Sequence, residues 1–223
     1  MSALQDATDN VLSVFGVRNR DKQPKYEVLE ILGEAIEGRR YAPRIAAQSI
    51  VKAASDREAR VSNFNILFRY ISGRNDGGSR IAMTVPVENR IAAPQGAKIA
   101  MTTPVDAESL GDNRYAMRFF LPREYTAETA PKPLDQRAEI ITLPEGTFAA
   151  IRFSGAWSQQ LFVEKRGVLL NALRNSTWYP VSDATTFFYD PPFTPPFLRR
   201  NEVAVRVERA AGAANSASAR VAA

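Results

Sequence analysis

The sequence contains neither histidine nor cysteine in its 223 residues. Their absence excludes a Ser-His-Asp triad, a cysteine nucleophile, a Cys/His zinc site and any disulfide. A heme iron held by a proximal histidine or a cysteine thiolate is excluded for the same reason. Much of the usual catalytic repertoire is therefore closed to this chain, and no motif in it indicates an enzyme.

Long apolar runs are missing as well. No stretch reaches the roughly 18 to 20 apolar residues of a membrane-spanning helix, and Met1 to Gly16 lacks the basic start and apolar core of a secretory signal. We therefore expect a cytoplasmic protein without an integral membrane segment. The net charge is +5, but no run of five basic residues concentrates it. We expect an anionic small molecule as partner and no nucleic acid, which needs a concentrated basic stripe.

The two ends of the chain differ in composition from its middle. Residues 1–24 predict an amphipathic helix and a polar linker, and the apolar helical face consists of Leu4, Thr8, Val11, Leu12 and Phe15. Residues 210–223 contain only Ala, Gly, Ser, Asn, Val and Arg. They bury too little apolar surface to offset the entropy of ordering, so they predict a flexible Ala-rich tail. One domain is expected over residues 25–209.

Within this domain, alternating apolar residues predict strands and a 3.6-residue period predicts two helices. The first helix begins at Asp56 as its N-cap and ends at Gly73, and the second runs from about Ser158 to Arg174. Hairpin-like spacings dominate and no βαβ alternation occurs, which predicts an α+β fold with an antiparallel sheet or barrel. One helix in each half indicates two similar halves. The predicted strands are Tyr26–Leu32, Arg40–Val51, Ile81–Val87, Lys98–Val105, Tyr115–Leu121, Ala138–Leu143, Thr147–Phe153, Thr185–Tyr189 and Glu202–Glu208.

Two segments indicate a binding surface. The helix from Asp56 to Ser72 carries Phe64, Leu67, Phe68 and Ile71 interleaved with arginines. It is either an apolar platform for a flat ligand, with basic groups that meet carboxylates, or a core-facing helix with a solvated basic edge. The pattern alone favours the second interpretation. A proline-rich segment from Tyr189 to Glu202 also has two interpretations. Its phenylalanines and arginines either cover a ligand or hold one edge of the sheet.

Several blocks of sequence closely resemble the SOUL heme-binding protein family, in the order in which the family has them. They span most of the predicted domain, roughly Lys25 to Arg209. The resemblance implies a distorted antiparallel β-barrel of about eight strands, with two main helices and pseudo-twofold halves. The matching blocks are Tyr70–Asp76, Arg80–Val87, Lys98–Val105, Phe120–Pro122, Pro131–Pro133, Ile151–Gly155, Tyr189–Pro192 and Arg199–Glu202.

The resemblance also implies a ligand, heme or another tetrapyrrole such as protoporphyrin, in an apolar cleft beside the first domain helix. The macrocycle falls on Val61, Phe64, Leu67 and Phe68, and a basic residue of the family matches Arg69. A second basic residue of the family falls on Val61, where Arg60 or Arg57 stands in. The family's loop lysine or arginine falls on Thr194 and Pro195, and Phe193 and Phe197 cover the ring instead. Met83 and Met101 are candidate weak iron ligands, although methionines on strands belong to the core more often.

The leading functional prediction is non-enzymatic binding of heme or protoporphyrin without histidine ligation, for buffering or transport. Two alternatives stay open. The fold also resembles the effector-binding domains of bacterial multidrug-responsive regulators, which take other aromatic or amphipathic small molecules. A tetrapyrrole-modifying enzyme is the third.

Overall fold

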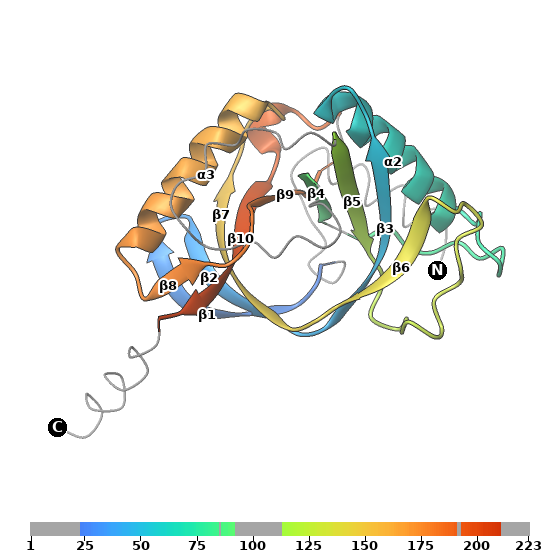
Figure 1. The fold of residues 1–223 in the computed structure, drawn as a ribbon, viewed down its shortest axis with the longest axis horizontal. Coiled ribbons are helices and arrows are strands. Elements are labelled where there is room, and N and C mark those ends of the chain that lie inside the picture. Colours follow the sequence, from blue (N-terminus) through green and yellow to red (C-terminus); the bar gives the residue numbers. More distant parts are fainter. Residues whose placement is uncertain (1–22, 85, 92–112, 191–192, 211–223) are drawn as a thin grey trace, which may run out of the picture.

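The computed structural model describes residues 23–84, 86–91, 113–190 and 193–210. Two helices, α2 (Asp56–Ile71) and α3 (Gln159–Arg174), lie on the outer face of one strongly curled antiparallel sheet (Figure 1). A short 3-10 helix, η2, spans Pro196–Leu198. The predictions for residues 1–22, Lys98–Val105, Met101 and residues 211–223 lie outside the described residues. The strands are β1 (Tyr26–Gly33), β2 (Ile36–Tyr41), β3 (Arg44–Lys52), β4 (Val87–Ile91), β5 (Arg114–Phe120), β6 (Ala138–Leu143), β7 (Gly146–Phe153), β8 (Trp178–Pro180), β9 (Thr185–Phe188) and β10 (Asn201–Arg209).

The strand order contains two similar halves. The first half consists of β2, β3, α2, β4 and β5, and the second of β6, β7, α3, β9 and β10. Across the sheet the order is β1-β2-β7-β10-β9-β4-β5-β3-β6, and β8 pairs with β10 off this path. The corresponding strands of the two halves are β2 and β6, β3 and β7, β4 and β9, and β5 and β10. When β1 is set aside and each strand is replaced by its counterpart, the order across the sheet is the same order read backwards. The predicted α+β class and pseudo-twofold halves are confirmed, and the described residues form ten strands of a half-barrel where about eight were expected.

One long ladder joins the two halves. β2 pairs with β7 and β3 pairs with β6, and both pairings share one register, which places Tyr41 opposite Gly146. In this register Pro43 stands opposite Pro144 at the break between the strands, and neither residue has an N–H to donate. The prediction of one strand from Arg40 to Val51 is therefore wrong, because two prolines interrupt the ladder and two strands replace it.

The predicted strand Ile81–Val87 is also wrong except at its last residue, where β4 begins. The N–H of Ile81 donates to the carbonyl oxygen of Ile71 at the end of α2, at 2.8 Å. The hydroxyl of Thr84 donates to the carbonyl oxygen of Phe120 at the end of β5. These bonds tie the segment to the ends of a helix and a strand, and they leave it outside the ladder. The three residues of β8 were not predicted, because so short a strand shows no alternation.

The N-cap of α2 is Ser55, not Asp56 as predicted. The hydroxyl of Ser55 accepts a hydrogen bond from the N–H of Glu58 at 3.2 Å, and the Glu58 carboxylate accepts one from the N–H of Ala54 at 3.2 Å. This is a variant of the capping box, in which a serine and a glutamate three residues later satisfy free N–H groups. Asp56 is the first helical residue, where its charge suits the positive end of the helix dipole. Ser158 caps α3 through its hydroxyl in the same way.

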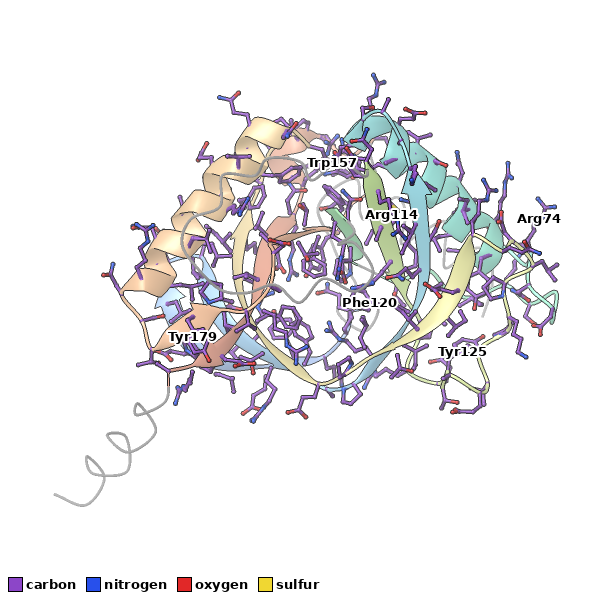
Figure 2. The ribbon with its side chains drawn as sticks, in the orientation of Figure 1. Arg74, Arg114, Phe120, Tyr125, Trp157 and Tyr179 are labelled. Carbon is purple, nitrogen blue, oxygen red and sulfur yellow. The ribbon has the colours of Figure 1, made fainter. Side chains whose placement is uncertain are left out.

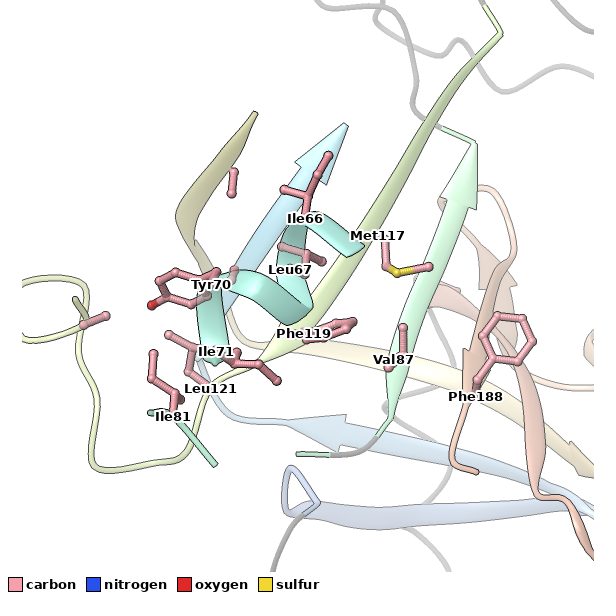
Figure 3. Close-up of a cluster of buried hydrophobic side chains, with 13 residues drawn as sticks. Ile66, Leu67, Tyr70, Ile71, Ile81, Val87, Met117, Phe119, Leu121 and Phe188 are labelled. Atoms are coloured by element: carbon pink, nitrogen blue, oxygen red, sulfur yellow. The ribbon is translucent and has the colours of Figure 1, made fainter. Parts of the chain in front are cut away.

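Each helix covers its own apolar core on the outer face of the sheet. α2 buries Leu67 and Tyr70 against Met117 and Phe119 of β5 (Figure 3). α3 buries one face over β7, β8 and β10, so that the short β8 contributes Trp178 to the second core. The buried residues of this second core are Ile36, Ala149, Ile151, Leu169, Leu173, Trp178, Val203, Val205 and Val207.

The opposite face of the sheet carries a buried ionic network. Side chains alternate along β10, so Val203 packs under α3 while Glu202 points to the other face. There Arg39 of β2 donates two hydrogen bonds to the Glu202 carboxylate, at 2.7 and 3.2 Å. Arg200 donates to the same carboxylate at 2.6 and 3.0 Å, and the hydroxyl of Tyr189 donates at 2.7 Å. The network ties β2 to β10 across the intervening β7.

The charges of this network support one another. Burial disfavours the charged form of Glu202, but Arg39 and Arg200 outweigh it and hold the pKa of this carboxyl below its ordinary value. Burial raises the pKa of the Tyr189 hydroxyl well above its ordinary value, so this group donates as a neutral phenol. Because the pKa of Glu202 is lower in the folded state, its contribution to stability is present above the unfolded pKa and is lost as the pH falls.

We therefore expect Glu202→Gln to lower the free energy of unfolding at pH 7 by about 3–5 kcal/mol, since Arg39 and Arg200 lose the carboxylate that they share and Arg39 keeps only its ion pair with Glu37. The difference from the unchanged protein should shrink as the pH falls below about 4.3, the ordinary pKa of glutamate. Urea unfolding at pH 7 and at acidic pH measures both effects. Glu27→Gln, which changes an exposed carboxylate paired with Arg40, is the control and should have little effect. A pH-independent difference for Glu202→Gln would contradict the assigned ionisation.

Candidate functional site

Three of the predicted site residues share an exposed strip on α2. Val61, Phe64 and Phe68 follow one another at intervals of three and four residues, which places them on one side of the helix. Val61 and Phe68 are exposed, Phe68 to 47%, and Phe64 is partly buried. These three residues are called the apolar strip below. Large exposed apolar side chains that adjoin one another indicate a surface for a partner or ligand.

The two rings of the apolar strip are stacked and held from below. The ring centroids of Phe64 and Phe68 lie 5.7 Å apart, with 12° between the ring planes. Phe64 in turn packs edge-on against buried Phe119 of β5, at 5.5 Å and 63°. The core thus fixes Phe64, and Phe64 supports Phe68. The strip therefore offers a nearly flat aromatic face that loses little side-chain entropy on binding.

Leu67 does not belong to this strip. It is 0% exposed and packs in the core beneath α2, with Tyr70 and Ile71 (Figure 3). Successive residues of a helix are turned by about 100° around its axis, so Leu67 can face the sheet although the next residue, Phe68, is exposed. The structure brings Val61, Phe64 and Phe68 together and separates Leu67 from them.

The predicted basic residues of α2 differ in what they contact. Arg60 forms an ion pair with Asp56 at 2.5 Å, and its guanidinium lies 6.0 Å from the ring of Phe188 on β9. Because β9 lies in the middle of the strand order, this contact places Arg60 on the side of α2 nearer to the middle of the sheet. Arg57 and Arg69 are exposed. Arg69 lines a groove on another side of the helix, beside Arg74.

Phe193 and Phe197 are both exposed, Phe197 to 75%, on the loop that contains η2. The loop is anchored beneath them, because Arg199 donates to the carbonyl oxygen of buried Thr194 at 2.7 Å. Its guanidinium also lies 4.9 Å from the ring of Trp157, which lies between the starts of the two helices (Figure 2). Within the described residues, neither phenylalanine makes a ring contact with the apolar strip.

Side chains that could ligate a metal ion and helices that could cross a membrane are scarce or absent in the described part of the chain. Met83 is partly exposed on the segment before β4, and Met101 lies outside the described residues. Over the described ranges, no three acidic side chains gather closely enough to hold a metal ion. In the same ranges, neither α2 nor α3 is long and apolar enough to cross a membrane.

Comparison with known protein families decides the assignment. The model of the SOUL heme-binding protein family matches residues 21–206, which is most of the chain. The chain belongs to the SOUL family. The resemblance seen in the sequence is thereby confirmed. No curated protein matches this SOUL chain.

Solved structures share the fold of this SOUL protein at low sequence identity. The C-terminal domain of EcmrR is 8% identical with a TM-score of 0.56, over 83% of this chain and 99% of that domain. A structure described as an EcmrR–DNA complex is also 8% identical with a TM-score of 0.56, over 93% of this chain and 66% of that one. A structure described as a hydrolase from Listeria innocua is 12% identical with a TM-score of 0.51, over 78% of this chain and 91% of that one. At such identities the likeness concerns the fold alone.

The separation of Leu67 from the apolar strip predicts unequal effects of substitutions at Leu67 and Phe68 on stability. Leu67→Ala should lower the free energy of unfolding by about 2–5 kcal/mol, because it leaves a cavity in the core beneath α2. Phe68→Ala removes a half-exposed ring and should cost clearly less. Urea unfolding of the two SOUL variants measures the difference. Equal losses would mean that Phe68 is as deeply packed as Leu67.

Proposed function

We propose that this protein binds heme and metal-free tetrapyrroles on the apolar strip of α2, without catalysing a reaction on them. Membership of the SOUL family supports heme or tetrapyrrole binding in general. The proposed location of the ligand rests on the stacked pair Phe64 and Phe68. These rings form an exposed aromatic face on a helix whose other large apolar residues are mostly buried. A porphyrin is a flat apolar ring that can lie against such a face.

The affinity follows from the area that such a ring covers. Burial of a few hundred Å² of apolar surface, at about 25 cal/mol per Å², contributes several kcal/mol. The loss of translational and rotational freedom removes a large share of this gain. Micromolar to submicromolar dissociation constants are expected for an open apolar surface. Such values suit buffering or transport of tetrapyrroles in the cytoplasm.

The basic side chains around the strip supply contacts for the two propionates. Arg57 is exposed and lies one helical turn before Val61, and its guanidinium group matches a carboxylate in shape and charge. Arg60 already pairs with Asp56, so its charge is partly neutralised before any ligand arrives. Arg57 is therefore the main proposed propionate partner, with Arg60 in a lesser role, whereas Arg69 lines the groove on another side of the helix.

The iron contributes little to binding in this proposal. The chain has no histidine or cysteine to ligate it, and a thioether such as that of Met83 is a weak ligand. Binding energy then comes from the ring and the propionates, which heme shares with protoporphyrin. The protein should therefore bind both rings with similar affinity.

Parallel titrations with hemin and with metal-free protoporphyrin test the proposal. Both rings should bind saturably, as followed by ligand absorbance and by tryptophan fluorescence. Phe68→Asp should weaken both by at least about tenfold, because a carboxylate must then be desolvated under an apolar ring. Val163→Asp, at an exposed apolar position on α3, is the matched control and should bind like the unchanged protein.

Several outcomes would contradict the proposal. Binding that requires iron would show that an axial ligand dominates. Equal losses in the α2 and α3 variants would remove the apolar strip as the site. If neither ring binds and an amphipathic cation does, the protein is an effector-type binder of other small molecules.

A further inference from the structure

A second candidate site lies on α2, away from the apolar strip. It is a groove of about 470 Å³ between the end of α2 and the loop that joins β5 to β6. Volumes of roughly 300 to 1,000 Å³ are typical of small-molecule sites. Ile66, Arg69, Tyr70 and Arg74 line one wall, and residues 134–137 line the other. This site is called the arginine groove below.

Hydrogen bonds hold the two walls together. The hydroxyl of Tyr70 donates to the carbonyl oxygen of Pro131 at 2.9 Å. Asp76 and Lys132 exchange two bonds, since the N–H of Asp76 donates to the carbonyl of Lys132 at 3.0 Å and the N–H of Lys132 donates to the Asp76 carboxylate at 2.7 Å. Burial raises the pKa of Tyr70 to about 12, so its hydroxyl stays a neutral donor to the loop. The groove is thus built before any ligand enters it.

The charges in the groove are unbalanced. Three arginines line it, Arg69, Arg74 and Arg137, against one carboxylate, Asp135. Arg137 engages Asp135 through two side-chain bonds, at 2.7 and 2.9 Å, which lower the pKa of this carboxyl to about 2. Among the described residues, no carboxylate lies within ion-pair distance of Arg69 or Arg74. Arg69 does lie near enough to Asp135 to help to lower the pKa of that carboxyl, but neither Arg69 nor Arg74 is held in an ion pair by a described carboxylate, so both guanidinium groups on this wall can reach an anion.

The arginine groove also exposes apolar surface. Leu134 is 65% exposed on the loop wall, and Ile66 and Tyr70 close the groove on the helix side. A planar guanidinium binds a carboxylate through two parallel hydrogen bonds. Arginines beside an uncovered leucine therefore fit a molecule that joins a carboxylate to an apolar body.

The groove and the apolar strip lie on different sides of α2. Phe68 is two residues from both Ile66 and Tyr70, which corresponds to a rotation of about 160° around the helix axis. Phe64, which stacks with Phe68, packs on Phe119 of β5, whereas the groove opens toward the loop before β6. Figure 2 shows Arg74 at the outer end of α2, on the side away from α3. A ligand in the groove does not need to displace one from the strip.

We propose that the arginine groove binds a small amphipathic carboxylate, held by Arg69 and Arg74 and covered by Leu134, at the same time as a tetrapyrrole occupies the strip. The proposal does not depend on the tetrapyrrole, because the groove is complete without the strip.

A fluorescent carboxylate and its neutral twin test this proposal. The probe is 6-(dansylamino)hexanoate, and its methyl ester has the same apolar body without the charge. The acid should bind saturably and at least about tenfold more tightly than the ester. Arg74→Gln should weaken binding of the acid by about tenfold and leave the ester unchanged. Leu134→Ser should weaken both.

Two control variants separate the groove from its surroundings. Arg123→Gln changes an exposed arginine of the same β5–β6 loop that does not line the groove, and it should have no effect on the acid. Phe68→Asp should leave binding of the acid unchanged even where it abolishes binding of hemin. Thermal unfolding midpoints of all variants check that each one is folded.

The proposal is overturned if the ester binds as well as the acid, or if Arg74→Gln and Arg123→Gln have equal effects. It is also overturned if Phe68→Asp weakens binding of the acid as much as binding of hemin, since both ligands then occupy one site. Loss of hemin binding alone in Phe68→Asp leaves it standing, so failure here is distinguishable from failure of the proposed tetrapyrrole site.

Discussion

Neither half of this protein can complete its sheet alone, because each half lends its first strand to the other. β2 pairs with β7 of the second half, and β6 pairs with β3 of the first. This exchange brings together segments that are far apart in sequence, such as Arg39 and Glu202, which are separated by 163 positions. Such contacts form only after a large loss of chain entropy. They therefore stabilise the complete fold and do not stabilise either half alone. The two helices and their surfaces rest on this ladder.

The helix α2 shows how much one element can carry on such a support. One side of it fills the first core, with Leu67 and Tyr70 fully packed. A second side presents the stacked rings of Phe64 and Phe68, and a third forms a wall of the arginine groove. Because the buried side fixes the helix rigidly, the two exposed sides keep their geometry without a ligand. Rigid support of this kind reduces the entropy lost on binding.

Local patterns in the sequence predicted the helices and most strands, but they did not predict features that depend on residues far apart in the chain. Helical spacing was sufficient to find α2 and α3, because both bury a continuous apolar face. The break at Pro43 depends on Pro144, which stands opposite it only in the folded sheet. The family resemblance grouped Leu67 with Phe68 as ligand contacts, because a match of sequence blocks shows which residues are apolar but not which of them the sheet covers.

The candidate sites show the same limit. Phe64 and Phe68 were found from the family resemblance, since both lie within one helix. The arginine groove was not, because Arg74 and Leu134 meet only when the β5–β6 loop folds back on the end of α2. Leu134 donates its N–H to the carbonyl of Arg74, a contact that no local pattern announces. Sites built within one element are visible in the sequence, and sites built between distant segments are not.

The palindromic strand order has a consequence for stoichiometry. The backbone offers two equivalent helices, and each begins at a serine N-cap on the outer face of the sheet. Counted from these serines, the positions of Phe64 and Phe68 on α2 correspond to Gly167 and Asn171 on α3. A glycine and an asparagine offer no aromatic face. The aromatic face of α2 therefore has no counterpart on α3, and the duplicated scaffold presents the proposed tetrapyrrole surface on one of these two helices only.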